Sequence, residues 1–413
     1  MKRVLLFFEY KTDRWARAGP HGIAKRLIAW SKRNREWELI MIELSNFPLY
    51  LLSMFDSHIF SKYNRLFPVK LLDIYKSLLL KLRICICSIT MNKLKKLFHD
   101  ADLIQIHGPV GFIALLKSLP EVLKTKPIIL AHHAPGAQFR YLTRQFPRME
   151  KTTYLQKIKE FEYLAFKFID TVIVPSRHTL DLLQQDLPEI NLNEKRIYII
   201  YNGIKPVHGS KGKIRRALNI PCDAFVISTI AKLIRDKGVD VIIKATHILK
   251  TKYLVKNLYL IIRGSGPELP YLKRLVREIE LSGEVRFLSY VQNIEDLYID
   301  SNVFVMAQRR AAFDLTVLEA LSAGVPVVVS DIGGNVEAVG SAGLRFKSED
   351  AHALAKTIYK LYVDHELRDT LSKKALEVFR ERYTLETMAN NYIRVYQERI
   401  RESCTSRVCA RHD

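Results

Sequence analysis

The sequence is poor in cysteine and has no long apolar run, and each absence excludes a class of protein. Its five cysteines, an odd number, form no Cys-x-x-Cys pair and lie beside no histidine cluster. Neither a disulfide framework nor a zinc site is therefore expected, and a reducing compartment is the simpler interpretation. No run reaches the roughly 18 uncharged apolar residues of a membrane-spanning helix. The apolar run at the N-terminus is short and ends at Glu9, which favours a first β-strand over a signal peptide.

Acidic residues are also scarce. The chain has 43 Asp and Glu against 65 Lys and Arg, which gives a formal net charge of +22. Such a charge favours anionic partners such as nucleotides, phosphates or anionic lipid. Nucleic acid is not an expected partner, because no recognised module is present and the basic residues are not interleaved with stacking aromatics. Low-complexity segments are absent and 48% of the 413 residues are hydrophobic, which indicates two domains of ordinary size.

Short apolar runs alternate with helical patterns along both halves of the chain. This alternation predicts an α/β protein with two doubly wound parallel sheets. Gly19-Pro-His-Gly22 is expected to break the chain before a helix over 23–32. The expected strands are 2–8, 38–44, 102–106, 128–132, 171–175 and 196–201 in the first half, and 224–231, 258–262, 285–288, 303–306 and 325–329 in the second.

Residues 202–212 have the composition of a linker, with three glycines and a proline between two strand-rich regions. The expected domains are therefore 1–203 and 204–386. A helix over 387–403 is expected to pack back on the first domain, and the tail 404–413 to be loose.

Residues 57–99 combine many basic residues with a single acid, Asp73, and with apolar residues between the charges. One interpretation is a basic amphipathic surface that docks on an anionic membrane. The alternative is ordinary α/β helices, each with a buried face and a solvated basic face.

Three signals in the second half suggest a binding site. Lys232 and Lys237 lie in the loop after an expected strand, and a helix begins beside Gly238. Two ammonium groups and a helix N-terminus suit a diphosphate, although a solvated basic loop has the same pattern. Gly264 and Gly266 follow the next strand, where glycine lets a ligand approach the backbone, although a plain turn also explains them.

The third signal is the stretch 307–338. Asp314 is a good N-cap for a helix from Leu315, and Glu319 is the only acid on that helix. Since all three signals follow strands of one parallel sheet, they are expected to meet at its carboxyl edge, where such sheets bind ligands. The joint interpretation is a nucleotide-diphosphate site in which amides and lysines bind the phosphates and Glu319 accepts hydrogen bonds from the ribose. No metal ion is expected, because the lysines and the helix dipole can neutralise a leaving diphosphate.

Taken together, these motifs resemble the retaining, nucleotide-sugar-dependent glycosyltransferases of family 4, also called group 1, over essentially the whole chain. The matching segments are 226–245, Gly264–Pro267, and 315–328 followed by Gly333–Gly334, with 170–176 and 201–204 resembling strand ends that border a cleft. The resemblance implies the GT-B fold, in which two Rossmann-like domains face a cleft.

The implied reaction is transfer of a hexosyl group, with retention of configuration, from a nucleoside-diphosphate sugar to a hydroxyl of a glycan or lipid-linked acceptor. The resemblance further implies no metal and no cofactor besides the nucleotide sugar. The cysteine content favours a cytoplasmic location, and the basic first domain suits a peripheral position on the inner face of a membrane.

Position by position, the resemblance assigns the donor diphosphate to Lys237 and to Lys232, which stands where the family commonly has Arg, and the ribose to Glu319. His132 is discounted, because alternation along the strand turns it away from His133, and a structural role for both histidines is the alternative. The resemblance assigns contact with the donor sugar near the reaction centre to His133, and the approach of the N-terminal loop to the phosphates to Gly22. Gly264 and Gly266 are assigned to the donor site. The diphosphate and the transferred sugar are assigned to the backbone amides of Phe313, Asp314, Leu315 and Thr316.

The chain departs from the family at Ala311, where a glutamate is usual. Alanine cannot hydrogen-bond the donor sugar, which would cost on the order of 2–3 kcal/mol, roughly 30–150-fold in rate. Three hypotheses follow: an enzyme in which Asp314 or another residue replaces the acid, an introduced change of Glu to Ala at 311, or a catalytically silent binding partner. A nucleotide-sugar epimerase of the same fold is the enzymatic alternative.

Overall fold

The computed structural model describes residues 1–8, 19–34, 36–43, 68–288, 293–310 and 313–409. The chain divides into two compact units, which are Met1–Ile200 with Ala389–Asp413 (unit 1) and Tyr201–Met388 (unit 2). Each unit contains one parallel sheet flanked by helices, which confirms the α/β class predicted from the alternation.

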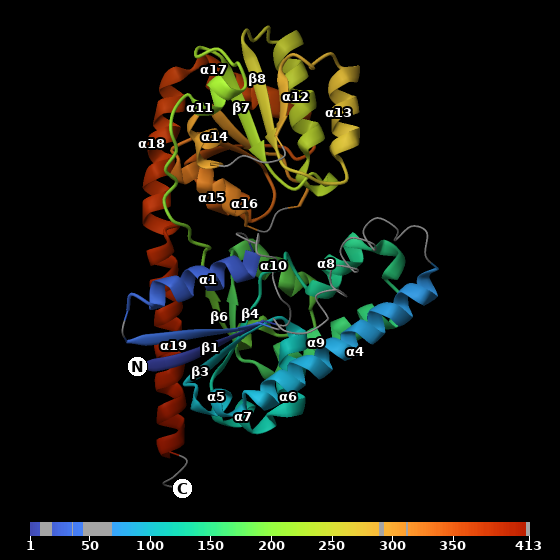
Figure 1. The fold of residues 1–413 in the computed structure, drawn as a ribbon, viewed down its shortest axis with the longest axis vertical. Helices are drawn as coiled ribbons and strands as arrows, with labels where there is room; N and C mark the ends of the chain where they lie inside the picture. The colour runs from blue at the N-terminus through green and yellow to red at the C-terminus, as the bar shows by residue number, and fades with distance from the viewer. Residues whose placement is uncertain (9–18, 35, 44–67, 289–292, 311–312, 410–413) are drawn as a thin grey trace. The chain divides into compact units, whose positions relative to one another are not determined.

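Unit 1 is built on a sheet whose described strands run in the order β2-β1-β3-β4-β5-β6. Its central strands β1 and β3 are almost entirely buried, because helices lie on both sides of the sheet (Figure 1). The expected strands of this half are all present, with ends shifted by two residues at most. They are β1 (Lys2–Phe8), β2 (Trp37–Glu43), β3 (Leu103–His107), β4 (Ile128–Ala131), β5 (Thr171–Val174) and β6 (Arg196–Ile199).

Helix α1 (Gly19–Ser31) begins earlier than expected. Gly19 and Pro20 belong to its first turn and do not break the chain before 23–32. A proline is compatible with that turn, because the first N–H groups of a helix have no intrahelical partner. The other described helices of this unit are α4 (Val69–Lys93), α5 (Lys95–Asp100), α6 (Pro109–Ser118), α7 (Pro120–Thr125), α8 (Gln138–Gln145), α9 (Thr153–Phe168), α10 (Arg177–Asp186) and α19 (Leu385–Cys409), which begins in unit 2, with the 3-10 turns η2 (Pro147–Met149) and η3 (Leu192–Glu194).

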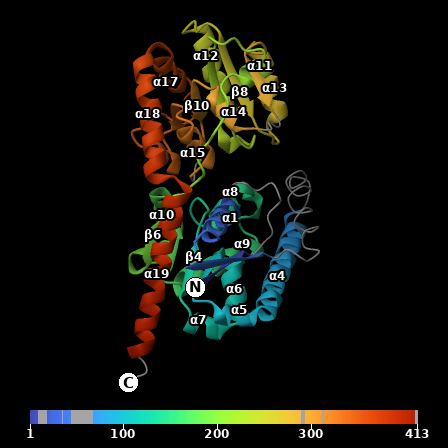
Figure 2. The same cartoon turned by 60° about the vertical axis from the view of Figure 1, so that its left-hand side comes forward.

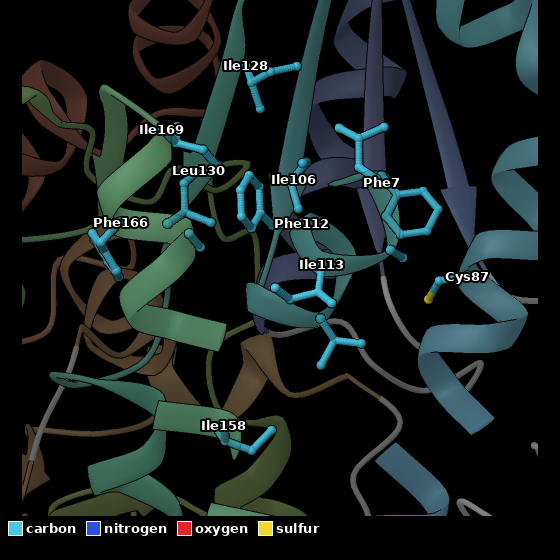
Figure 3. Packing of buried hydrophobic residues seen from close by; sticks show 14 of the residues in the cluster. Phe7, Cys87, Ile106, Phe112, Ile113, Ile128, Leu130, Ile158, Phe166 and Ile169 are labelled. Carbon is cyan, nitrogen blue, oxygen red and sulfur yellow. The ribbon is translucent and has the colours of Figure 1, made fainter. Parts of the chain in front are cut away.

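Buried side chains of the sheet meet those of the helices in the core of unit 1 (Figure 3). Phe7 and Ile106 of the sheet belong to one cluster with Phe112 and Ile113 of α6, and Cys87 adds α4 to it. Each of these side chains is at most 3% exposed. The inner face of α4 is therefore fixed by packing. Among the described helices, none combines the length and apolar character that crossing a membrane requires.

Unit 2 has a sheet whose described strands run in the order β12-β11-β10-β7-β8-β9. The sequence pattern predicts all of these strands except β12 (Gly343–Phe346), a short edge strand without a β-branched residue. The predicted helix stop is confirmed, since α15 (Leu315–Ser322) ends before Gly324, which has a φ of 66°. The remaining elements are β7 (Phe225–Ile230), β8 (Leu258–Arg263), β9 (Val285–Leu288), β10 (Val303–Met306), β11 (Val327–Ser330), α11 (Lys213–Ala217), η4 (Arg235–Lys237), α12 (Val239–Thr251), α13 (Leu269–Glu278), α14 (Glu295–Ile299), α16 (Gly334–Val339), α17 (Ala351–Val363) and α18 (His365–Arg382).

Candidate functional site

Loops that follow β7, β8, β10 and β11 meet at the carboxyl edge of the unit 2 sheet. Parallel strands deliver these loops to the same edge, and hydrogen bonds join them to one another. The three signals in the second half of the sequence, which are the lysine loop, the glycine loop and the stretch from 307, therefore lie together. The joining bonds are Leu233 N to Ser265 O at 2.9 Å, Arg309 N to Asp236 O at 2.8 Å, and Asp314 N to Asn335 Oδ1 at 2.9 Å.

Asp314 is the centre of this arrangement, in a different role from the expected one. It occupies the N-cap position of α15, but its side chain accepts no hydrogen bond from the helix, so the predicted side-chain cap is wrong. The carboxylate instead accepts from Lys237 Nζ at 2.8 Å, from Asn335 Nδ2 at 3.0 Å and from Gln308 Nε2. Burial alone would raise the pKa of Asp314, but the Lys237 ammonium and the two amides lower it below its ordinary value.

Gly238 allows Lys237 to reach this position. It lies between η4 and α12 with a φ of 62°, and a Cβ there would fall 1.8 Å from the carbonyl oxygen of Ala307. Only glycine accepts both the backbone conformation and the contact. The exit of β10 and the start of α12 therefore touch, and this contact brings Lys237 beside Asp314. Lys232, earlier in the same loop, is exposed.

Gly264 and Gly266 support the lysine loop. A Cβ at Gly264 would lie 1.9 Å from Ala231 O, and one at Gly266 would lie 2.2 Å from Leu233 O. The chain's own loop thus makes a close backbone approach that these glycines permit, and their assignment to the donor site stays a prediction. Their effect on Lys232 is indirect, since they seat the backbone that carries it.

The first residues of α15 present backbone and one buried hydroxyl at this edge. Phe313 is buried, with its ring stacked on Tyr201 at 5.5 Å between centroids and edge-on to Tyr383 at 5.8 Å. Leu315 is buried in the same cluster. The Thr316 Oγ1 is buried and has no hydrogen-bond partner among the described residues. The rings fix the start of α15, and the hydroxyl of Thr316 is a polar group that a bound anion or sugar could satisfy.

Glu319 lies one turn further along α15. Its Oε2 accepts a hydrogen bond from the hydroxyl of Tyr298 at 2.7 Å. Tyr298 is fully buried, and burial, with the Glu319 charge beside it, raises the pKa of its hydroxyl. The tyrosine therefore stays a donor that orients the carboxylate. No motif in the sequence marks Tyr298, since its α14 helix shows no site-like pattern.

His133 lies in unit 1, just after β4. Its ring stacks on that of His107, with parallel planes and centroids 5.3 Å apart, and His107 stacks in turn on Phe8 at 3.9 Å. The Gln105 amide lies 2.9 Å from His107 Nε2, and its oxygen accepts from the Tyr396 hydroxyl at 2.9 Å. The sequence pattern identified neither His107, on which His133 stacks, nor Gln105 and Tyr396, which hold His107 in place.

His132 has a different environment. Its Nε2 lies 2.7 Å from the carbonyl oxygen of Gly136, and burial lowers the pKa of the ring. The bond ties the exit of β4 to the loop before α8, which is a structural role for this histidine.

Two of the predicted site positions lie next to or outside the residues that the structure describes. Gly22 is buried in the first turn of α1, and the loop 9–18 before it is outside the described residues. Ala311, the position of the expected acid, is also outside the described residues. Asp314 is the nearby acid that could replace the expected one, but Lys237 and two amides already bind its carboxylate.

Two family models match successive parts of the chain. The model for glycosyl transferases group 1 matches residues 210–378, and that for glycosyltransferase family 4 matches residues 63–208. Together the two models cover most of the chain.

The curated relatives resemble part of the chain. An O-antigen biosynthesis glycosyltransferase WclY of Escherichia coli is 31% identical over 238 residues, which is 57% of this chain and 63% of the relative. A D-inositol 3-phosphate glycosyltransferase of Corynebacterium urealyticum is 33% identical over 192 residues, 44% of this chain and 45% of the relative. The matched region thus spans less than two thirds of the length of these relatives.

Solved structures resemble the whole chain in fold. A glycosyltransferase from Rickettsia africae has a TM-score of 0.68 at 15% identity, covering 97% of this chain and 98% of the other. HepE of Anabaena, solved in complex with UDP, has a TM-score of 0.67 at 18% identity, with 96% and 100% covered. WaaG, a glycosyltransferase involved in lipopolysaccharide biosynthesis, has a TM-score of 0.65 at 16% identity, with 95% and 99% covered.

Proposed function

We propose that this chain transfers a sugar from a nucleoside-diphosphate sugar to a hydroxyl acceptor with retention of anomeric configuration. The proposal starts from its family, because the chain belongs to the glycosyltransferases of group 1 and family 4 and has their GT-B fold. The acceptor class is a glycan or a lipid-linked saccharide, and the transferred group is a hexose or a derivative of one. The UDP bound to HepE, a protein of the same fold, supports a nucleotide donor.

The observation that carries the donor assignment is the arrangement at the N-terminus of α15. Lys237 Nζ lies 2.8 Å from Asp314, and the unpartnered hydroxyl of Thr316 lies in the first turn. An ammonium has three donors, so Lys237 can bind a phosphate oxygen while it keeps Asp314. The helix dipole and the exposed Lys232 add positive potential for the second phosphate. Glu319, oriented by Tyr298, accepts from the ribose hydroxyls.

This set of groups suits a reaction whose difficulty lies in charge separation. The bond between the anomeric carbon and the diphosphate breaks, and the sugar gains oxocarbenium character. The acceptor hydroxyl attacks from the face that the diphosphate leaves, and a phosphate oxygen of the donor takes its proton. Because a diphosphate is a better leaving group than an alkoxide, positioning and electrostatic stabilisation replace the paired carboxylates of glycosidases. We assign neutralisation of the diphosphate to the lysines and the helix dipole, without a metal ion, and contact with the donor sugar to His133.

Position 311 has alanine where an acid is expected. Unless another group replaces that acid, the reaction should be slower. Asp314 is a poor substitute, since Lys237, Gln308 and Asn335 already bind its carboxylate. We therefore propose an active enzyme that Ala311→Glu accelerates, by roughly 30–150-fold if the acid restores a transition-state hydrogen bond.

Donor turnover tests this function directly. A thermal-shift screen of nucleotide sugars identifies the donor, and release of nucleoside diphosphate is then followed with and without acceptor. Tight donor binding with no transfer or hydrolysis, by either the natural chain or Ala311→Glu, would show a catalytically silent binding partner. Isomerisation of the nucleotide sugar without any acceptor would show an epimerase.

A further inference from the structure

Helix α4 is apolar on two of its faces. Its inner face packs in the core of unit 1 through Leu72, Leu80, Ile84, Cys87 and Met91. Its outer face also carries large apolar side chains, each between 38% and 59% exposed, together with the exposed Cys85. This outer stripe consists of Leu71, Ile74, Leu78, Leu82, Cys85 and Ile89. Figures 1 and 2 show α4 along the outside of unit 1, with α6 and α9 on its inner side.

The outer stripe is straight. Its steps of three and four residues average to the helical repeat of 3.6 residues, so its side chains fall within an arc of about 80° along the whole helix. A coiled-coil seam repeats every 3.5 residues and drifts around the helix. A seam through Leu71, Leu78 and Ile89 would include Tyr75, which is half-buried, and would leave out Ile74, which is 57% exposed. The spacing is therefore compatible with both a flat apolar surface and a second helix, and the charges beside the stripe decide between them.

The charges beside the outer stripe are positive. Lys70 and Lys81 are exposed on one border of the stripe, and Lys93 is exposed at its C-terminal end. The only acid in α4, Asp73, points to α9, where its carboxylate accepts from the backbone N–H of Thr153 at 3.0 Å and of Tyr154 at 2.8 Å.

The basic character continues into α5 with the exposed Lys95 and Lys96. Lys95 lies 3.3 Å from Glu121, which offsets its charge. Lys76 differs from the other lysines of α4, because it is buried and lies over the ring of Phe146. The net result for the outer face of α4 is a row of apolar side chains bordered by cations.

Unit 2 shows that such a row is not a general property of this protein. Among the residues of this unit that the structure describes, the exposed large apolar ones lie singly on three different segments, at Leu254, Tyr271 and Val363. Scattered residues of this kind are normal on protein surfaces, whereas a contiguous row with a charged border marks an interaction site.

We infer that the outer stripe of α4 docks on an anionic lipid bilayer. The apolar side chains enter the boundary between head groups and acyl chains, and Lys70, Lys81 and Lys93 lie at the level of the lipid phosphates. This inference deepens the proposed function, on which it rests for the choice of a lipid-linked acceptor, since docking would hold unit 1 at the surface where such an acceptor lies.

Vesicle flotation tests docking without donor or acceptor, so its failure is distinguishable from failure of the proposed transfer. The chain is mixed with phosphatidylcholine vesicles that contain about 30% phosphatidylglycerol, and with pure phosphatidylcholine vesicles. We expect flotation with the anionic vesicles and little with the neutral ones. Absence of flotation with the anionic vesicles would overturn the inference.

Two native thiols locate the docked surface. Cys85 lies in the outer stripe, whereas Cys222 is exposed in unit 2. Alkylation followed by mass spectrometry should show Cys85 protected by anionic vesicles and Cys222 unchanged. Equal reactivity of Cys85 with and without vesicles would contradict docking through the stripe. Protection of Cys85 that needs no vesicle and grows with protein concentration, with a dimer by light scattering, would replace the bilayer by a second copy.

Matched variants separate the apolar and the charged contributions. Ile74→Gln with Leu78→Gln should lower partition into anionic vesicles by about tenfold or more. Leu254→Gln with Val363→Gln removes two apolar side chains of comparable exposure from unit 2 and should leave partition unchanged.

Lys70→Gln with Lys81→Gln should weaken binding roughly 30-fold at low salt, since each lysine near the surface contributes about fivefold. Lys252→Gln with Lys256→Gln makes the same change of charge at exposed positions of unit 2 and is the control. The inference would be overturned if the Ile74/Leu78 variant and the Lys70/Lys81 variant bound anionic vesicles as well as their controls in unit 2.

Discussion

Unit 1 and unit 2 share a parallel sheet flanked by helices, yet the carboxyl edges of their sheets are built from different groups. In unit 2 the edge is ionic, with Asp314 bound to Lys237. In unit 1 it is a series of stacked rings, Phe8, His107 and His133. The Gln105 amide nitrogen lies 2.9 Å from His107 Nε2 and so fixes the ring of His107 in this stack. One architecture thus places an ion pair at the carboxyl edge of one sheet and stacked aromatic rings at the carboxyl edge of the other.

The largest expected effect comes from removing the cation of the ionic edge. Lys237→Ala leaves the Asp314 carboxylate without its counterion beside the proposed diphosphate position. We expect the kcat/KM for the donor to fall by about 10²–10³-fold, and the affinity for the nucleoside diphosphate to fall with it.

Lys232→Ala is the comparison for that variant, because Lys232 is exposed and shows no ion pair among the described residues. Its effect should be about tenfold, since an exposed charge is partly screened by solvent. Steady-state kinetics and titration calorimetry measure both. A Lys237→Ala variant within threefold of the natural chain would remove the ionic edge of unit 2 from the mechanism.

Glycines give the second contrast between the units. A Cβ at Gly238 in unit 2 would meet backbone, 1.8 Å from Ala307 O, at a φ of 62°. A Cβ at Gly111 in unit 1 would meet only side chains, 3.0 Å from Ile106 and 3.1 Å from Phe7. We expect Gly238→Ala to lower the free energy of unfolding by about 3 kcal/mol and Gly111→Ala by about 1 kcal/mol.

Gly283→Ala is the control for both glycine variants. No atom lies within 4 Å of its Cβ position, so its effect should stay within about 0.5 kcal/mol. Denaturant unfolding measures all three, and an equal loss at Gly111 and Gly238 would show that the backbone contact of Gly238 is not the limiting one.

The strands were predictable from the sequence because burial on both faces leaves little choice of residue. Val303–Met306 is apolar throughout and lies at the centre of its sheet. The same argument fails for β12, whose Gly-Leu-Arg-Phe sequence lies at a partly exposed edge. A different local rule fails at α1. Glycine and proline usually indicate a break, but Gly19 and Pro20 are both compatible with the first turn of a helix.

The site was predictable as a location and less so as a set of contacts. The carboxyl ends of parallel strands meet whatever the loops contain, so Lys237 and the start of α15 had to be neighbours. The N-cap rule is local, and it assigned Asp314 to its own helix. The partner that Asp314 has in the fold, Lys237, is 77 positions away in sequence, and no local pattern records that pairing. The same holds for Tyr396 and Gln105, which are 291 positions apart.

A smaller effect is expected from the helix that supports the ring edge of unit 1. The buried hydroxyl of Tyr396 donates to Gln105 Oε1, and the Gln105 amide holds His107 against His133. Tyr396→Phe removes that bond, which should cost about 1 kcal/mol of stability and lower kcat severalfold while KM for the donor changes little.

Tyr392→Phe, at an equally buried tyrosine of the same helix, is the control for the hydrogen bond to Gln105. A fall in kcat that is the same for both variants would point to general loosening of α19. An unchanged kcat in Tyr396→Phe would show that the ring edge does not depend on this bond.

The smallest effect is expected at two partly buried carboxylates, one in each unit, which have different hydrogen-bond partners. The pKa of Asp314 in unit 2 is lowered against the effect of burial by Lys237, and that of Asp73 in unit 1 by backbone N–H groups of Thr153 and Tyr154. Because both folded-state pKa values lie below the unfolded value of about 3.9, each group stabilises the fold above that pH and loses the contribution as pH falls through its folded pKa.

Asp314→Asn and Asp73→Asn should therefore each flatten the acid limb of stability below about pH 5 relative to the natural chain. Salt should separate them. At Asp314 the partner is a cation and 22% of each side chain is exposed, so about 0.5 M NaCl should reduce the difference between the natural chain and the variant. At Asp73 the partners are neutral amides, and the difference should not change. Equal salt dependence at the two sites, measured by urea unfolding between about pH 3 and 7, would show that the ionic edge of unit 2 and the amide-bound carboxylate of unit 1 are not electrostatically distinct.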